Sequence, residues 1–170
     1  MSDKLELFID GEFIQSETEN WIQVLNPATQ EVLCEAPCAT ESEIENAISS
    51  AQAAFLTWRE TPPPERSRIM MRYQELLKQN QDKIAEILSK ENGKTFEDAK
   101  GDVWRGIEVV EQAANITPLL MGETVENVAR EIDSYSYLQS LGVCLGITPF
   151  NFPAMIPCLL YTSPSPRDIS

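Results

Sequence analysis

Histidine is absent from this chain of 170 residues, and its absence excludes several kinds of site. A mixed cysteine–histidine zinc site needs an imidazole ligand, and a serine or cysteine nucleophile that is paired with histidine needs an imidazole base. Neither can be built from these residues. The sequence therefore indicates that no nucleophile within it is activated by imidazole.

Basic residues and long apolar runs are also few. Thirteen Lys and Arg against 27 Asp and Glu give a net charge of −14, which repels a phosphate backbone, so we expect no nucleic acid partner. The longest apolar runs, such as Val143 to Ile147, are far shorter than the ~20 residues that span a bilayer, so we expect no membrane partner. The first residues include acids and form neither an apolar signal core nor an Arg-rich presequence, which favours a cytoplasmic location.

Only four cysteines occur, namely Cys34, Cys38, Cys144 and Cys158. A single Cys-x3-Cys pair is weak support for a metal site, and we expect none; free thiols that pack as small, buried or half-buried apolar groups are the better interpretation. The hydrophobic fraction of 42% and the charged fraction of 24% are ordinary for a globular protein. The length is typical of one domain.

The N-terminal part has the pattern of a small antiparallel β region. Asp10-Gly11 lies between two apolar runs over residues 7–14, which predicts a hairpin with a type I′ turn. Residues 21–25 and 31–36 are typical of strands, and Asn26-Pro27-Ala28-Thr29 predicts the turn between them.

Three helical patterns follow. Thr40 and Glu43 have the spacing of a capping box, before an apolar stripe of Ile44, Ala47, Ile48, Ala51, Phe55 and Trp58. Pro62-Pro63-Pro64 ends that helix, and the last proline can begin the next one, which runs to a left-handed cap at Gly93 with a possible break at residues 80–82. Thr95 then caps a helix with a stripe of Phe96, Ala99, Val103, Ile107, Val110 and Ala114.

The C-terminal part returns to strand patterns. Residues 131–139 predict a half-exposed strand, and Val143 to Ile147 is continuously apolar, as in a parallel strand covered on both faces. Ligands of open α/β sheets bind at the carboxyl ends of such strands, which makes residues 148–153 the best candidate site. No Gly-x-Gly-x-x-Gly occurs. Pattern alone predicts a piece of an α/β enzyme and names no reaction.

A resemblance to a known family adds to this. Residues 147–153, Ile-Thr-Pro-Phe-Asn-Phe-Pro, resemble the Pro-aromatic-Asn-Phe-Pro motif of the aldehyde dehydrogenase superfamily. Residues 26–29, 91–94 and 141–143 also occur in the order that family uses, so the resemblance covers about residues 7–157. It implies the N-terminal part of the aldehyde dehydrogenase fold, an α/β fold with β hairpins, three or four helices and the start of a Rossmann-like parallel sheet, truncated.

The resemblance also implies a division of the chain. Residues 1–122 would be the N-terminal part of an NAD-binding domain, 123–140 a β arm that joins subunits into a homo-oligomer, expected to be a tetramer, and 141–157 the first strand and turn of the sheet. After Pro157 the resemblance ends, and residues 158–170 look like a non-native tail from a translated adaptor. A natural Ser/Pro-rich linker is the alternative.

Within the superfamily, Phe150 in place of the commoner Trp, together with residues 153–157 and 101–106, resembles the methylmalonate-semialdehyde branch. This implies an intact enzyme that oxidises malonate or methylmalonate semialdehyde with NAD, releases CO2 and passes the acyl group to CoA, forming acetyl-CoA or propionyl-CoA. A semialdehyde dehydrogenase without CoA and a non-catalytic oligomerisation piece are the alternatives.

The same resemblance implies roles for single residues. Asn151 occupies the position that stabilises an oxyanion, and Thr148 and Phe150 occupy the segment along which the family binds NAD. Arg105 is a candidate for binding the substrate carboxylate. Asn151 could instead cap a turn, and Arg105 could pair with Asp102 or Glu108. In the family the nucleophilic cysteine and the general-base glutamate lie beyond the matched region, so we expect this chain alone to be inactive.

Overall fold

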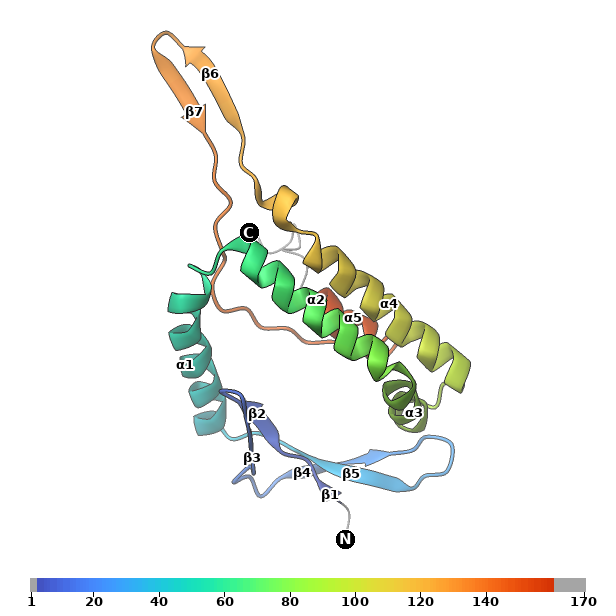
Figure 1. Ribbon diagram of the computed structural model, residues 1–170. Coiled ribbons are helices and arrows are strands. Elements are labelled where there is room, and N and C mark those ends of the chain that lie inside the picture. Colours follow the sequence, from blue (N-terminus) through green and yellow to red (C-terminus); the bar gives the residue numbers. More distant parts are fainter. Residues whose placement is uncertain (1–2, 161–170) are drawn as a thin grey trace.

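The computed structural model describes residues 3–160 as a mixed α/β structure (Figure 1). Helix α4 (Phe96–Ala114) packs against α2 (Pro63–Gln79), α3 (Gln81–Asn92) and α5 (Met155–Leu159). Helix α1 (Glu41–Trp58) lies apart from this group and contacts strand β2. Within these residues, no helix combines the length and the apolar character that crossing a membrane requires.

The N-terminal strands confirm the predicted hairpin and turn. Asp10 and Gly11 both have positive φ, 56° and 81°, as a type I′ turn requires, and the Asn26 side chain accepts hydrogen bonds from two backbone N–H groups of the second turn. The region is not wholly antiparallel, however, because β1 pairs in parallel with β5, a contact too short to leave a sequence pattern. The strands are β1 (Asp3–Lys4), β2 (Leu7–Ile9), β3 (Glu12–Ile14), β4 (Trp21–Leu25) and β5 (Val32–Pro37).

Three predicted caps are formed, but α1 ends at Trp58, four residues before the prolines that were expected to end it. The capping box of Thr40 and Glu43 is formed, Thr95 accepts a hydrogen bond from the third residue of α4, and Gly93 ends α3 with a φ of 78°. Helix α2 begins at the second of the three prolines, whose fixed φ and missing N–H suit a first turn. The predicted break is also confirmed, since α2 ends at Gln79 and α3 begins at Gln81.

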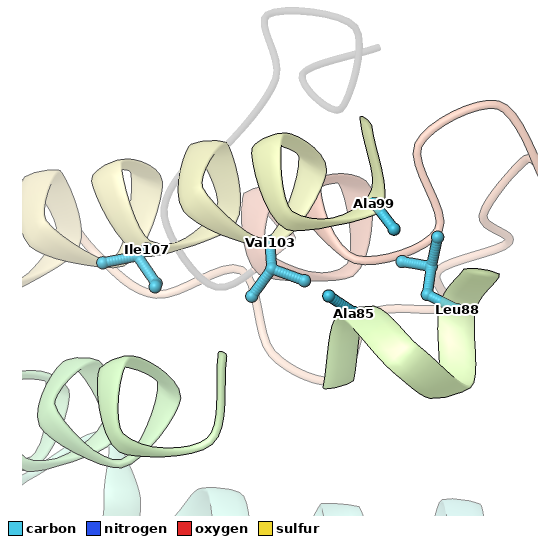
Figure 2. Close-up of a cluster of buried hydrophobic side chains, with 5 residues drawn as sticks. All are labelled: Ala85, Leu88, Ala99, Val103 and Ile107. Atoms are coloured by element: carbon cyan, nitrogen blue, oxygen red, sulfur yellow. The ribbon is translucent and has the colours of Figure 1, made fainter. Parts of the chain in front are cut away.

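The buried core lies between α3 and α4. Figure 2 shows its side chains on the facing sides of the two helices: Ala85, Leu88, Ala99, Val103 and Ile107. Each fully buried valine or isoleucine contributes roughly 1.5–3 kcal/mol. The predicted stripe of α4 is therefore confirmed, except that Phe96 at its start is 37% exposed.

Helix α1 is formed as predicted, but its stripe is not buried. Ile44 is 50% exposed and Trp58 is 42% exposed, and α1 contains no buried residue. The apolar spacing determines which face of a helix is hydrophobic, whereas burial depends on a second surface, and the described residues leave most of this face exposed.

The C-terminal part differs most from expectation. Strands β6 (Thr124–Ala129) and β7 (Ile132–Tyr135) form an exposed hairpin that projects beyond the short helix η1 (Thr117–Leu120), as Figure 1 shows, and β7 is shorter than predicted. The predicted buried strand over residues 143–147 is wrong for this structure. The segment has no strand pairing, and Leu145 and Ile147 are 89% and 86% exposed. A strand needs a hydrogen-bonded neighbour, and no described residue supplies one.

The segment predicted to be a non-native tail begins inside the folded part. Cys158 lies in α5 and is buried, close enough to α4 that a Cβ on Gly106 would come within 3.1 Å of its sulfur. Most of that predicted tail, residues 161–170, lies outside the described residues.

Candidate functional site

A hollow of about 420 Å³ lies beside the N-terminal half of α4. It brings together two of the residues that the sequence singled out, Arg105 from α4 and Asn151 from the loop before α5. The other lining residues are Lys94, Glu97, Asp98, Gly101, Asp102 and Phe152. Segments distant in the sequence therefore converge on one concave surface that carries charges of both signs.

An ion pair lies at the base of this hollow. The Lys94 ammonium is 3.3 Å from the Asp102 carboxylate, and the Asp102 side chain is only 1% exposed. Lys94 also donates a hydrogen bond of 2.6 Å to the backbone carbonyl of Asn151 and lies 4.7 Å from the centre of the Phe152 ring. One cation thus joins the start of α4 to the loop that carries Asn151.

Two further hydrogen bonds fix the backbone of the same loop. The Asn92 side chain donates to the carbonyl of Phe150 at 2.9 Å, and the second carboxylate oxygen of Asp102 accepts from the backbone N–H of Met155 at 3.0 Å. Gly106 allows α5 to approach α4, because a Cβ there would lie 3.4 Å from the carbonyl oxygen of Ala154. The loop is held on both sides of Asn151.

Asn151 is exposed, and its side-chain amide forms no hydrogen bond with any described residue. Helix α5 has Ala154 as its N-cap and no side-chain cap bond. The turn-capping alternative for Asn151 therefore has no hydrogen bond to support it, and the amide remains available to a ligand in the hollow.

Arg105 is also exposed and forms no ion pair among the described residues. Asp102, which the sequence offered as an ion-pair partner of Arg105, is paired with Lys94 instead. The guanidinium lies 5.4 Å from the centre of the Phe152 ring, a distance typical of a cation–π contact. The Glu97 and Asp98 carboxylates line the same hollow, so Arg105 is the cation there that is not neutralised by an ion pair.

The two predicted cofactor residues do not line the hollow. Thr148 is half-buried, and Phe150 is 82% exposed with its main-chain carbonyl bonded to Asn92. The structure therefore places Asn151 and Arg105 together and leaves Thr148 and Phe150 on the adjoining loop.

All four cysteines are free thiols, and none lines the hollow. Burial raises the pKa of the Cys158 thiol, partly offset by a hydrogen bond with Tyr73, and burial together with the Glu91 carboxylate raises the pKa of Cys34. The expectation that all would be buried or half-buried is wrong for Cys38 and Cys144, which are exposed. Within residues 3–160, no cluster of acidic and cysteine residues could hold a metal ion.

The sequence analysis assigned no role to Asn92 or Lys94, and it considered Asp102 only as an alternative partner of Arg105. A signal for Asp102 was present, since its spacing from Ala99 and Val103 places an acid on the buried face of α4, and a buried carboxylate needs a partner. No comparable local signal identifies Asn92 or Lys94, because their partners lie in a distant loop.

Known proteins resemble the chain throughout this region. Residues 13–162 match the aldehyde dehydrogenase family. A Dictyostelium discoideum protein assigned as an acylating, mitochondrial methylmalonate-semialdehyde/malonate-semialdehyde dehydrogenase is 53% identical over 161 residues, which are 95% of this chain and 30% of that protein. The human mitochondrial acylating enzyme of the same name is 47% identical over 157 residues, 92% of this chain and 29% of the human protein.

The fold comparison agrees. A protein of Sinorhizobium meliloti 1021, solved with NAD and assigned as methylmalonate-semialdehyde dehydrogenase, superposes with a TM-score of 0.89 at 42% identity, over 93% of this chain and 32% of that one. The chain thus spans about 30% of the length of these relatives and has the N-terminal part of the aldehyde dehydrogenase fold. Family match, identity and fold together show that the chain belongs to the aldehyde dehydrogenase family.

Proposed function

We propose that this chain is part of an enzyme that oxidises malonate or methylmalonate semialdehyde with NAD, releases CO2 and transfers the acyl group to CoA. The identity to acylating semialdehyde dehydrogenases supports the reaction class. The single observation within the chain that carries the proposal is the meeting of Arg105 and Asn151 in one hollow. A substrate with both a carboxylate and an aldehyde offers one group to each.

Arg105 binds the substrate carboxylate in this proposal. A guanidinium presents a planar pair of N–H donors that matches the two oxygens of a carboxylate. Contact with the Phe152 ring orients the guanidinium, and the absence of an ion pair among the described residues leaves its donors free. The nearby carboxylates of Glu97 and Asp98 oppose the binding of an anion, so the bidentate geometry has to outweigh them.

Asn151 acts on the aldehyde oxygen. When a thiolate adds to the aldehyde carbon, the carbonyl oxygen becomes negatively charged, and the amide N–H of Asn151 donates a hydrogen bond to it without bringing a charge of its own. Its backbone carbonyl is fixed by Lys94, so the side chain is positioned before the charge develops.

NAD would lie along the loop of Thr148 and Phe150. The described backbone from residue 143 to residue 149 has no strand pairing, so its polar groups are open to a ligand, which fits a cofactor laid along it. When bound, NAD supplies the acceptor for the hydride that leaves the substrate. The chain's own part is to hold the cofactor beside Asn151. CoA enters as the second substrate, in accord with the acylating activity named for the relatives.

Residues 1–122, 123–140 and 141–157 remain proposed as cofactor-binding part, oligomerisation arm and first sheet element. The exposed hairpin of β6 and β7 suits an arm that pairs with another subunit. A cytoplasmic location also stays a prediction, and the mitochondrial names of the relatives point the other way.

The test uses a hybrid enzyme in which residues 1–157 replace the matching segment of the human relative. We expect NAD- and CoA-dependent conversion of malonate semialdehyde to acetyl-CoA. Asn151→Ala removes one oxyanion donor and should lower kcat by roughly 100- to 1000-fold, with little change in NAD binding. Asn46→Ala, on the exposed surface of α1, is the matched control and should leave the rate unchanged.

Two outcomes count against the proposal. A hybrid that folds and binds NAD but does not form an acyl-CoA product from the semialdehyde contradicts the reaction. A loss below tenfold for Asn151→Ala contradicts the oxyanion role.

A further inference from the structure

Three hydrogen bonds restrain the loop that carries Asn151, and two of them depend on one ion pair. The Asp102 carboxylate contacts Lys94 with one oxygen and the Met155 N–H with the other. Lys94 in turn holds the Asn151 carbonyl. We infer that Lys94 and Asp102 are positioning residues that set the orientation of the Asn151 amide. This inference rests on the proposed oxyanion role of Asn151.

Burial distinguishes this pair from an ordinary surface ion pair. The side chains of Lys94 and Asp102 are 20% and 1% exposed, whereas those of Lys100 and Asp82, which also pair, are 39% and 66% exposed. Water screens the exposed pair, so it contributes little. The buried carboxylate, by contrast, needs its partners, which makes the geometry of the Lys94 pair well defined.

The local chain explains why Lys94 can reach both partners. Gly93 ends α3 in the left-handed conformation and Thr95 starts α4, so Lys94 lies in the short connection between two fixed helix ends. The Ser89 hydroxyl donates to its carbonyl at 2.7 Å, which fixes the backbone from which the side chain extends. The Phe152 ring lies against the ammonium and restricts it further.

Position matters because catalysis depends on small distances. A misplacement of about 1 Å can cost on the order of 100-fold in rate, even when the altered residue does not touch the reacting atoms. Neither Lys94 nor Asp102 needs to contact the aldehyde to influence the rate. Their effect passes through the backbone on either side of Asn151.

Lys94→Met removes the ammonium and keeps most of the side-chain length. In the hybrid enzyme we expect kcat for malonate semialdehyde to fall on the order of 10- to 100-fold with the KM for NAD unchanged, and Lys94→Arg to recover most of that loss. Lys100→Met, which breaks the exposed pair, is the matched control and should leave kcat unchanged.

The double variant Lys94→Met/Asp102→Asn separates positioning from stability. The side-chain oxygen that Asp102→Asn keeps can still accept a hydrogen bond from the Met155 N–H, and no unpaired buried charge remains. The melting temperature should therefore rise from that of Lys94→Met towards that of the parent. The rate should stay low. A double variant that regains both stability and kcat would show that Lys94 only neutralises a buried charge, and would overturn the inference.

Hydrogen exchange of backbone amides in the 170-residue chain tests whether Lys94 restrains the loop, without a measurement of activity. Lys94→Met should speed exchange of the Met155 N–H, while the amides of the α3–α4 core stay protected and Lys100→Met changes neither. A hybrid that folds and binds NAD but forms no acyl-CoA would refute the proposed function, yet the exchange result would still show whether Lys94 restrains the loop. Unchanged exchange at Met155 in Lys94→Met contradicts the inference.

Discussion

At the scale of single residues, Glu43 shows how one side chain links two parts of the chain. Its carboxylate accepts hydrogen bonds from the Thr40 N–H and the Glu17 N–H, and also from the hydroxyls of Ser16 and Thr40. These bonds, the Thr40 backbone bond foremost, lower its pKa from 4.5 to about 2. The capping box could be predicted from the spacing of Thr40 and Glu43. The contacts with residues 16 and 17 could not, because they join distant segments.

This shift predicts a dependence of stability on pH. A carboxylate with a lowered pKa in the folded state stabilises the fold fully above its unfolded pKa, and the contribution is lost as the pH falls from about 4.5 towards 2. Glu43→Gln should therefore lower the free energy of unfolding at pH 6 and differ little from the parent near pH 2. Urea unfolding at several pH values measures the difference, with Glu45→Gln on the exposed surface of α1 as the control. A difference between parent and Glu43→Gln that does not change with pH argues against the shift.

At the scale of elements, caps and turns could be predicted, while contacts between elements could not. The left-handed cap at Gly93 followed from the sequence, but its packing on the turn before β5 did not: a Cβ on Gly93 would lie 2.8 Å from Cγ of Pro27. The apolar run over residues 143–147 does not form the predicted strand, again because a contact between distant segments decides the outcome. Its composition favours a strand, but pairing depends on a neighbour that local sequence does not specify.

The Gly93 contact yields a prediction with a matched control. Gly93→Ala should destabilise the chain by about 1–2 kcal/mol for the left-handed conformation alone, and by more because Pro27 has to move. Gly11→Ala has a similar φ of 81° and nothing within 4 Å, so it carries the conformational cost only. Chemical unfolding of both variants compares them. Equal losses of unfolding free energy in the two variants would mean that Pro27 moves aside at no energetic cost, and would contradict the prediction.

At the scale of the whole molecule, the resemblance identified the family, but the sequence did not show which helices pack against one another. The stripe of α4 is buried because α2, α3 and α5 pack against α4, whereas the equally regular stripe of α1 stays largely exposed. Of the candidate site, the resemblance singled out Asn151 and Arg105, which the structure brings together in one hollow, while their roles stay predictions. Lys94 and Asn92 could not, since hydrogen bonds across the fold define them.

The 170-residue chain by itself should not reduce NAD with any aldehyde. None of its thiols lines the hollow, and Cys158 is buried with a raised pKa, so little thiolate forms at neutral pH. Absorbance at 340 nm with malonate semialdehyde, propanal and NAD measures this directly. Turnover that disappears in Cys144→Ser or Cys158→Ser would contradict the account.

The central claim, that Arg105 selects a substrate with a carboxylate, is tested most directly by Arg105→Ala in the hybrid enzyme. A hydrogen bond to a charged group is worth about 1.5–3 kcal/mol, so kcat/KM for methylmalonate semialdehyde should fall roughly 10- to 150-fold. Propanal lacks the carboxylate, and its kcat/KM should change little. The melting temperature, recorded beside the kinetics, reports any lost packing on Phe152. Equal losses for both aldehydes with a lowered melting temperature would make Arg105 a structural residue and contradict the claim.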